Sequence, residues 1–236
     1  MTYTKKTKVK AEIIKCDFCK EKFGTDDLLF KHLCEKKRRF QQRDLKVVQF
    51  AFALFTEFVK KKGNKKLPTI ESFENSSLYS SFVGFATHLN RICAIDPLGF
   101  IKFLLDANIG INKWKQDHYY ERWIRERSKT QPPLEAMQQS ISLMEQWSVE
   151  TGEDWTEFFE KIEIPRALLW IKSGKLSPWL ILSVPEASSV MLKRMSPEQL
   201  VMVEELIDFD YWQIKLDRYP DDVDYMKTIW QETIGT

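Results

Sequence analysis

The sequence contains few of the residues on which many enzymes and secreted proteins depend. Of 236 residues, four are Cys and three are His, and there are only eight Gly and nine Pro. Four cysteines in a chain of this length are too few for a disulfide framework. Three histidines leave little for general acid–base catalysis, and no phosphate loop, dinucleotide fingerprint or nucleophile elbow is present. We therefore expect a protein that is not an enzyme.

The sequence also lacks long apolar runs and a secretory signal. No run approaches the roughly 18 apolar residues that a membrane-spanning helix requires. The first fifteen residues carry Lys5, Lys6, Lys8 and Lys10 but no apolar core and no small-residue cleavage site. These features predict a cytoplasmic protein with no membrane partner.

Charge is distributed unevenly along the chain. Residues 1–66 contain 19 Lys and Arg against 8 Asp and Glu, whereas residues 67–236 contain 17 against 26. A basic end joined to an acidic remainder is typical of proteins that bind nucleic acid with one part and a protein with the other. A basic segment that is merely solvated is the alternative.

A metal-binding pattern lies within the basic part. Cys16 and Cys19 form a C-x2-C pair, and Phe23, Leu29 and His32 continue it as C-x2-C-x3-F-x5-L-x2-H. Two cysteines at this spacing can direct both thiolates at one ion, and the later His adds a third ligand. The segment resembles a two-Cys two-His zinc finger, in which the Phe and Leu form a small apolar core.

The fourth ligand departs from that pattern. Cys34 follows His32 by two residues, and on a regular helix two such side chains point roughly 200° apart. Cys34 can therefore bind only if a short helix, capped by Thr25, unwinds at Leu33, or else the fourth ligand lies elsewhere. With unwinding, three thiolates and one imidazole close a tetrahedral structural zinc site, Cys16, Cys19, His32 and Cys34. Ordinary buried cysteines are the alternative interpretation.

Basic residues surround this motif. Gathered on one small surface, they would neutralise phosphates with a salt-dependent affinity that carries no sequence preference. Asp26 and Asp27 at the start of the predicted helix disfavour base reading. The predicted phosphate contacts of this segment are Lys31, Lys36, Lys37, Arg38, Arg39 and Arg43.

A second basic segment lies further along the chain. Arg122, Arg125 and Lys129 share one face of a predicted helix, and Trp114 or Tyr119 could stack a base beside them. The alternative is a charged solvent face opposite aromatic core residues.

The sequence as a whole predicts a mainly α fold, in which a small N-terminal zinc finger is followed by an all-helical multi-helix domain. We place the finger module in residues 1–43 and the helical body in 44–236, with a candidate hinge at 60–68. Helix starts are indicated by Asp96-Pro97, Ser177-Pro178 and Ser196-Pro197. All eight Trp lie at or after position 114, and most are expected in the core.

Three stretches carry a resemblance that extends over most of the chain. They are Phe30–Phe40, Glu153–Phe159 and Ser173–Trp179. Together they resemble an uncharacterised family of tailed-bacteriophage proteins. The resemblance implies a role in phage nucleic-acid metabolism inside a bacterium, and it transfers no site residues.

These observations favour one function over two others. The expected function is that of a zinc-finger accessory protein, which contacts the phosphates of DNA, or less favourably RNA, and docks a protein partner in replication, recombination or transcription. In the alternative, a protein–protein adaptor, the zinc is purely structural. An enzyme with a site assembled from distant residues is disfavoured.

Overall fold

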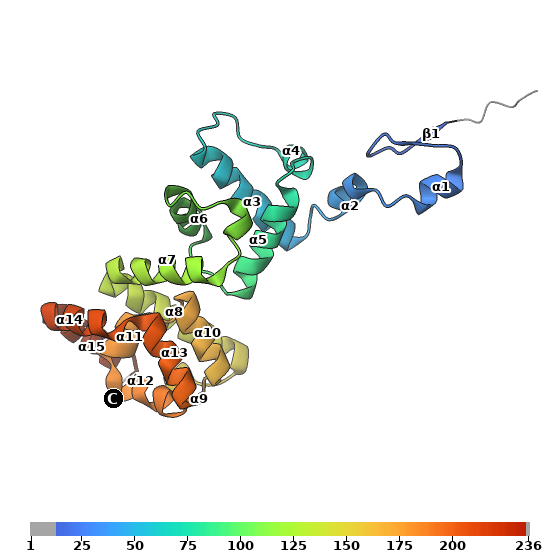
Figure 1. The fold of residues 1–236 in the computed structure, drawn as a ribbon. Coiled ribbons are helices and arrows are strands. Elements are labelled where there is room, and N and C mark those ends of the chain that lie inside the picture. The colour runs from blue at the N-terminus through green and yellow to red at the C-terminus, as the bar shows by residue number, and fades with distance from the viewer. Residues whose placement is uncertain (1–12, 235–236) are drawn as a thin grey trace, which may run out of the picture. The chain divides into compact units, whose positions relative to one another are not determined.

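A computed structural model describes residues 13–234 of the chain. Within that range the protein has fifteen α-helices and one two-stranded sheet (Figure 1), which confirms the mainly α prediction. The lysines that precede residue 13 lie outside the described residues. In the part of the chain that the structure describes, no helix has both the length and the apolar character needed to cross a bilayer.

The chain divides into two compact units, Met1–Ala86 and Thr87–Thr236. The boundary that we predicted after residue 43 therefore falls inside the first unit, and the candidate hinge at 60–68 falls there too. In order, the elements of this unit are β1 (Ile14–Lys15), β2 (Lys22–Phe23), α1 (Asp26–Lys31), α2 (Glu35–Gln41), α3 (Lys46–Lys61), α4 (Ile70–Glu74) and most of α5 (Tyr79–Arg91).

The first unit is held by an aromatic cluster between α3, α4 and α5. Measured between ring centroids, Phe55 lies 5.0 Å from Phe73 and 5.3 Å from Phe82, and Phe73 lies 5.0 Å from Tyr79. All four side chains are buried, and aromatic pairs at such distances add attraction to the burial of their area. This cluster makes α3 to α5 one packed body.

The second unit is a continuous assembly of helices around a tryptophan-rich core. Trp170, Trp179 and Trp212 are all buried, as we predicted for most of the tryptophans. In order, its elements are α6 (Pro97–Asp106), a 3₁₀ turn (Ile111–Lys113), α7 (Asp117–Thr130), α8 (Pro133–Thr151), a 3₁₀ turn (Trp155–Glu157), α9 (Phe158–Lys161), α10 (Ile164–Ser173), α11 (Pro178–Ser183), α12 (Pro185–Lys193), α13 (Pro197–Ile207), α14 (Phe209–Arg218) and α15 (Pro220–Ile234).

The predicted proline starts are confirmed. Pro97, Pro178 and Pro197 are the first residues of α6, α11 and α13. Proline fits this position because the first helical N–H has no partner within the helix. Ser196 completes the predicted capping box with Gln199 at the start of α13.

Gly174 ends α10 and offers a test of packing in the second unit. Its φ of +77° is left-handed, and an added Cβ would overlap the Ile124 side chain and lie 3.2 Å from Ile95. Gly152, which ends α8, has the same φ of +77°, but a Cβ there meets nothing within 4 Å. We expect Gly174→Ala to lower the free energy of unfolding by about 3 kcal/mol, against about 1 kcal/mol for Gly152→Ala. Urea denaturation checks both, and equal losses would show that Ile124 does not pack as described.

Candidate metal centre and basic surface

A short hairpin positions the first two cysteines. β1 and β2 pair antiparallel, with Ile14 opposite Phe23. Directly after β1, the Cys16 carbonyl accepts the Lys20 N–H and the Cys16 N–H donates to the Glu21 carbonyl, both at 2.9 Å. The chain reverses tightly here because Lys20 adopts a left-handed φ of +64°. This turn brings Cys16 and Cys19 to one side of the hairpin. The two strands were not predicted from the sequence, because each has only two residues.

The helix before His32 ends at Lys31, so that His32 and Cys34 are not held on opposite faces of one continuous helix. Thr25 caps α1 as predicted, its side chain accepting the Leu28 N–H at 3.3 Å. His32 is the C-terminal cap of α1 in an extended conformation, and Cys34 is the N-terminal cap of α2. The Cys34 sulfur accepts the Lys37 N–H at 3.4 Å. The predicted unwinding at Leu33 is therefore confirmed.

These elements bring the four predicted ligands together. The Sγ atoms of Cys16 and Cys34 are 3.7 Å apart, and Cys19 Sγ lies 3.2 Å from His32 Nε2. All four ligand atoms lie within 4.8 Å of one another. Metal–sulfur bonds of about 2.3 Å in a tetrahedral site imply ligand separations of about 3.8 Å. The cluster therefore matches a tetrahedral metal site.

The cysteines are free thiols that differ in acidity. The backbone N–H of Cys19 is the main cause that lowers the pKa of Cys16 to about 7. For Cys19, the Glu21 N–H acts to lower the pKa, but burial and the neighbouring thiols raise it above its usual value. A cation placed among the sulfurs would favour the thiolate form at both positions, because its charge offsets their repulsion.

The segment around this cluster has no apolar core of its own. Between residues 13 and 47, Cys16 and Cys34 are the buried side chains, with 4% and 7% of their surface exposed. Phe23 contacts the His32 ring at 4.8 Å and remains partly exposed. A segment that buries so little apolar surface needs another source of stability, which a bound metal would supply.

The basic residues of this segment up to Arg43 fall into three groups. Lys31 and Arg38 are exposed and pair with acidic neighbours, Asp27 at 2.8 Å and Glu35 at 2.7 Å. Exposed pairs of this kind contribute little to stability and exchange readily with other anions. A second set is exposed and has no ion pair with any described residue, namely Lys15, Lys20, Lys22, Lys36 and Lys37.

Arg39 and Arg43 are engaged by the protein itself. Arg39 donates to the Glu74 carbonyl at 2.7 Å and lies 4.5 Å from the centre of the Tyr79 ring. Arg43 donates two hydrogen bonds to the Glu74 carboxylate, at 3.0 and 2.9 Å. These partners could not be predicted from the sequence, because they lie more than thirty residues away from the arginines. Both arginines serve to anchor α2 on α4, and their contact with phosphate remains a sequence-based prediction.

The Arg43–Glu74 pair makes Glu74 a sensitive position. Its side chain is 10% exposed, whereas Glu71, which lies 3.9 Å from the same guanidinium, is 62% exposed. Glu74→Gln should lower the free energy of unfolding of the first unit by about 2 kcal/mol, because a charge-assisted pair is lost in a buried setting. Glu71→Gln is the matched control and should leave it nearly unchanged, because that carboxylate is exposed to solvent. Urea denaturation measures both, and equal effects would contradict the role of Glu74.

The second basic segment is divided in the same way. Arg122 on α7 is exposed and Arg125 is partly buried. Lys129 lies 3.1 Å from Asp208, and its amine lies over the Tyr211 ring at 4.5 Å. The ion pair and the ring contact hold Lys129 against α14, so the predicted phosphate-binding face is not a free row of cations.

The suggestion that Trp114 stacks a base is wrong. This side chain is 1% exposed and donates its Nε1–H to the Ile109 carbonyl at 2.8 Å. The sequence could not show that Trp114 is buried, because the charged residues on either side of it, Lys113 and Lys115, are equally compatible with a surface position. Tyr119 is partly exposed, and its stacking role remains a prediction.

Comparison of the chain with known protein families, with characterised proteins and with solved structures finds no match. The resemblance to a family of tailed-bacteriophage proteins therefore stays a prediction.

Proposed function

We propose that this protein is a nucleic-acid-binding accessory protein whose N-terminal finger is held together by zinc. The observation that carries the proposal is the cluster of three thiols and one imidazole in a segment with no core of its own. Three sulfur ligands and one imidazole at tetrahedral separations suit zinc better than the oxygen-preferring divalent ions. Four protein ligands leave no coordination position for water, so the metal has a structural role.

The surface of the finger supports phosphate binding. The finger has five exposed lysines without an acidic partner among the described residues. They lie on β1, the following turn, β2 and α2, which are elements that the cluster joins: Lys15, Lys20, Lys22, Lys36 and Lys37. Cations that are not neutralised by the protein gain most from replacing the counterions of a nucleic acid. Asp26 and Asp27 occupy the first turn of α1, where a DNA-reading finger places its base contacts. We therefore assign backbone contact without sequence recognition, to DNA in the first place.

Quantifying bound metal and measuring DNA affinity together test the proposal. We expect one zinc per chain and binding of a fluorescent oligonucleotide that weakens steeply between about 50 and 200 mM salt. With three to five phosphates contacted at once, the logarithm of the affinity for duplex DNA should fall with a slope of about −3 to −4.5 against the logarithm of salt concentration. A metal-loaded protein that binds neither single-stranded nor double-stranded DNA at low salt would refute nucleic-acid binding.

One observation favours the adaptor as a second candidate. Phe30 and Leu33 are 89% and 96% exposed, beside the metal ligands. Large apolar side chains that are this exposed often belong to a protein-docking surface. In the adaptor case the basic surface meets an acidic protein, and a complex captured from lysate survives nuclease treatment. If the adaptor is correct, replacing both Phe30 and Leu33 by serine should remove the nuclease-resistant complex. A complex that persists in this double variant contradicts a docking role for the two side chains.

A further inference from the structure

A pocket of about 310 Å³ lies in the second unit, where the end of α7 and the following loop meet α14. Its lining includes the pyrrolidine rings of Pro132 and Pro133 and the aromatic rings of Tyr211 and Tyr219. Ligand pockets in proteins have volumes of roughly 300–1,000 Å³ and combine apolar walls with a few polar groups. This pocket lies at the lower end of that range and admits one small molecule.

Two cations line the pocket without an ion pair to any described carboxylate, Lys215 and Arg218 on α14. The Lys215 amine donates to the Lys129 carbonyl at 2.6 Å and lies 4.6 and 4.8 Å from the rings of Trp179 and Trp212. The two rings attract the Lys215 ammonium but accept no strong hydrogen bond from it. Its N–H donors other than the one directed at the Lys129 carbonyl therefore remain for a ligand. Arg218 is exposed at the pocket wall. A small anion would meet both cations.

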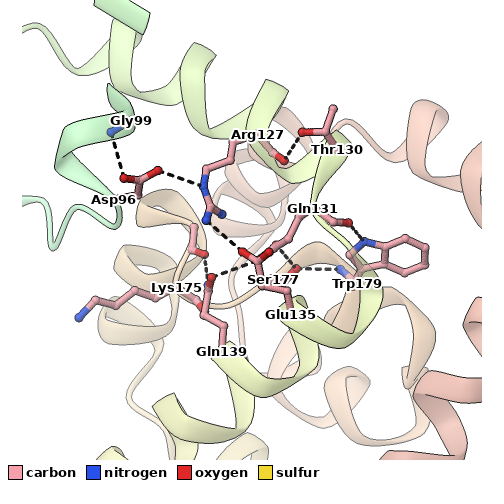
Figure 2. A network of polar contacts seen from close by, with 11 residues as sticks. Asp96, Gly99, Arg127, Thr130, Gln131, Glu135, Gln139, Lys175, Ser177 and Trp179 are labelled. Atoms are coloured by element: carbon pink, nitrogen blue, oxygen red, sulfur yellow. Dashed lines mark hydrogen bonds and ion pairs between the residues drawn. The ribbon is translucent and has the colours of Figure 1, made fainter. Parts of the chain in front are cut away.

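The wall opposite α14 is fixed by a buried hydrogen-bond network (Figure 2). Trp179 donates to the Gln131 carbonyl at 3.1 Å, and the Gln131 side chain donates to Gln139 at 3.1 Å. Gln139 in turn donates to the Lys175 carbonyl at 2.8 Å, and Ser177 donates to Gln131 at 3.4 Å. Satisfied networks of this kind hold a loop in one conformation. The pocket is therefore formed before a ligand enters, which lowers the entropic cost of binding.

We propose that this pocket binds a nucleoside monophosphate, with the phosphate on Lys215 and Arg218 and the base against the ring-lined wall. Arg218 can hold a phosphate through two parallel hydrogen bonds. Tyr219, which is 47% exposed, offers a ring on which a base can stack, whereas the Tyr211 ring already carries the Lys129 amine. Asp222 also lines the pocket and opposes a more highly charged group. Burial lowers the pKa of Lys215, as expected for an amine with no carboxylate partner, while Asp222 acts to raise it.

Calorimetric titration of the full chain with adenosine monophosphate tests the assignment. We expect one saturable site that adenosine and adenosine triphosphate fill more weakly, because one lacks the phosphate and the other exceeds the charge and size. Arg218→Ala should weaken binding by about tenfold or more. Lys102→Ala, which removes an exposed cation on α6, is the matched control and should leave it unchanged. Lys215→Met should also lose binding, with circular dichroism reporting on its fold.

The source of the nucleotide is settled by comparing a short oligonucleotide with and without a 5′-phosphate. If the 5′-phosphate raises the affinity for the oligonucleotide, and Arg218→Ala abolishes this increase, the ligand is the end of a nucleic-acid strand. If the free monophosphate binds but the 5′-phosphate does not raise the affinity for the oligonucleotide, the ligand is a mononucleotide. The proposal is overturned if the monophosphate gives no saturable binding at millimolar concentration, if adenosine binds equally well, or if Arg218→Ala behaves like Lys102→Ala.

Discussion

Serine in place of Cys16 or Cys19 should remove the metal and unfold the finger while the packed helices remain. Bound zinc should fall from one per chain to nearly none, since an oxygen at either position replaces a sulfur ligand that closes the tetrahedral site. Because residues 13–47 bury little besides Cys16 and Cys34, the hairpin pairing of β1 with β2 and a few partly exposed ring contacts should not suffice to hold β1, β2 and α1 together. Elemental analysis measures the zinc, and hydrogen exchange locates the unfolding.

Cys93→Ser is the matched control for this prediction. Cys93 is the one cysteine outside the cluster, and it is partly buried in the second unit. The variant should keep one zinc per chain and the exchange protection of the finger. Full retention of zinc in Cys16→Ser and in Cys19→Ser would rule out the cluster as the metal site. Cooperative melting of the whole chain would instead show that the finger is integral to the core.

Replacing Lys36 and Lys37 together by alanine should weaken DNA binding by about a hundredfold near 50 mM salt. Each phosphate contact contributes about tenfold at that salt concentration through counterion release, and the salt slope should become shallower by about 2. Both side chains are exposed and without an ion pair among the described residues, so their loss should not disturb the fold. Fluorescence anisotropy across a salt series measures affinity and slope together.

A second lysine pair shows whether location or total charge matters. Lys65 and Lys66 are exposed in the loop after α3, and their replacement by alanine changes the net charge by the same amount. Affinity should then fall by less than about threefold. Equal losses in the two double variants would mean that general basicity, and not the finger surface, attracts the nucleic acid.

The parts of the structure that could be predicted from the sequence follow local rules. Pro97, Pro178 and Pro197 mark helix starts because the constraint acts within one residue. The break at Leu33 followed from the angle between His32 and Cys34 on a helix. Both inferences needed only neighbouring positions.

The parts that the sequence did not reveal depend on distant contacts. Arg39 and Arg43 lie among other basic residues and look alike to any local rule, yet Glu74 engages both of them. Likewise, the burial of Trp114 depends on how the second unit packs. Composition predicted that positive charge gathers near the metal, whereas only the structure separates the cations that face solvent from those that hold α2 in place.

Cys34 and Arg43 lie at the two ends of one short element. α2 begins at Cys34, a candidate metal ligand, and Arg43, just past its end, donates to the Glu74 carboxylate on α4, so that with a metal bound the helix would act as a strut between the ion and the helical core. A chelator that extracts the ion would release one end of this strut and thereby loosen the other. If the cluster holds a metal, metal loading is therefore thermodynamically linked to the packing of α2 on α4 through Arg43 and Glu74.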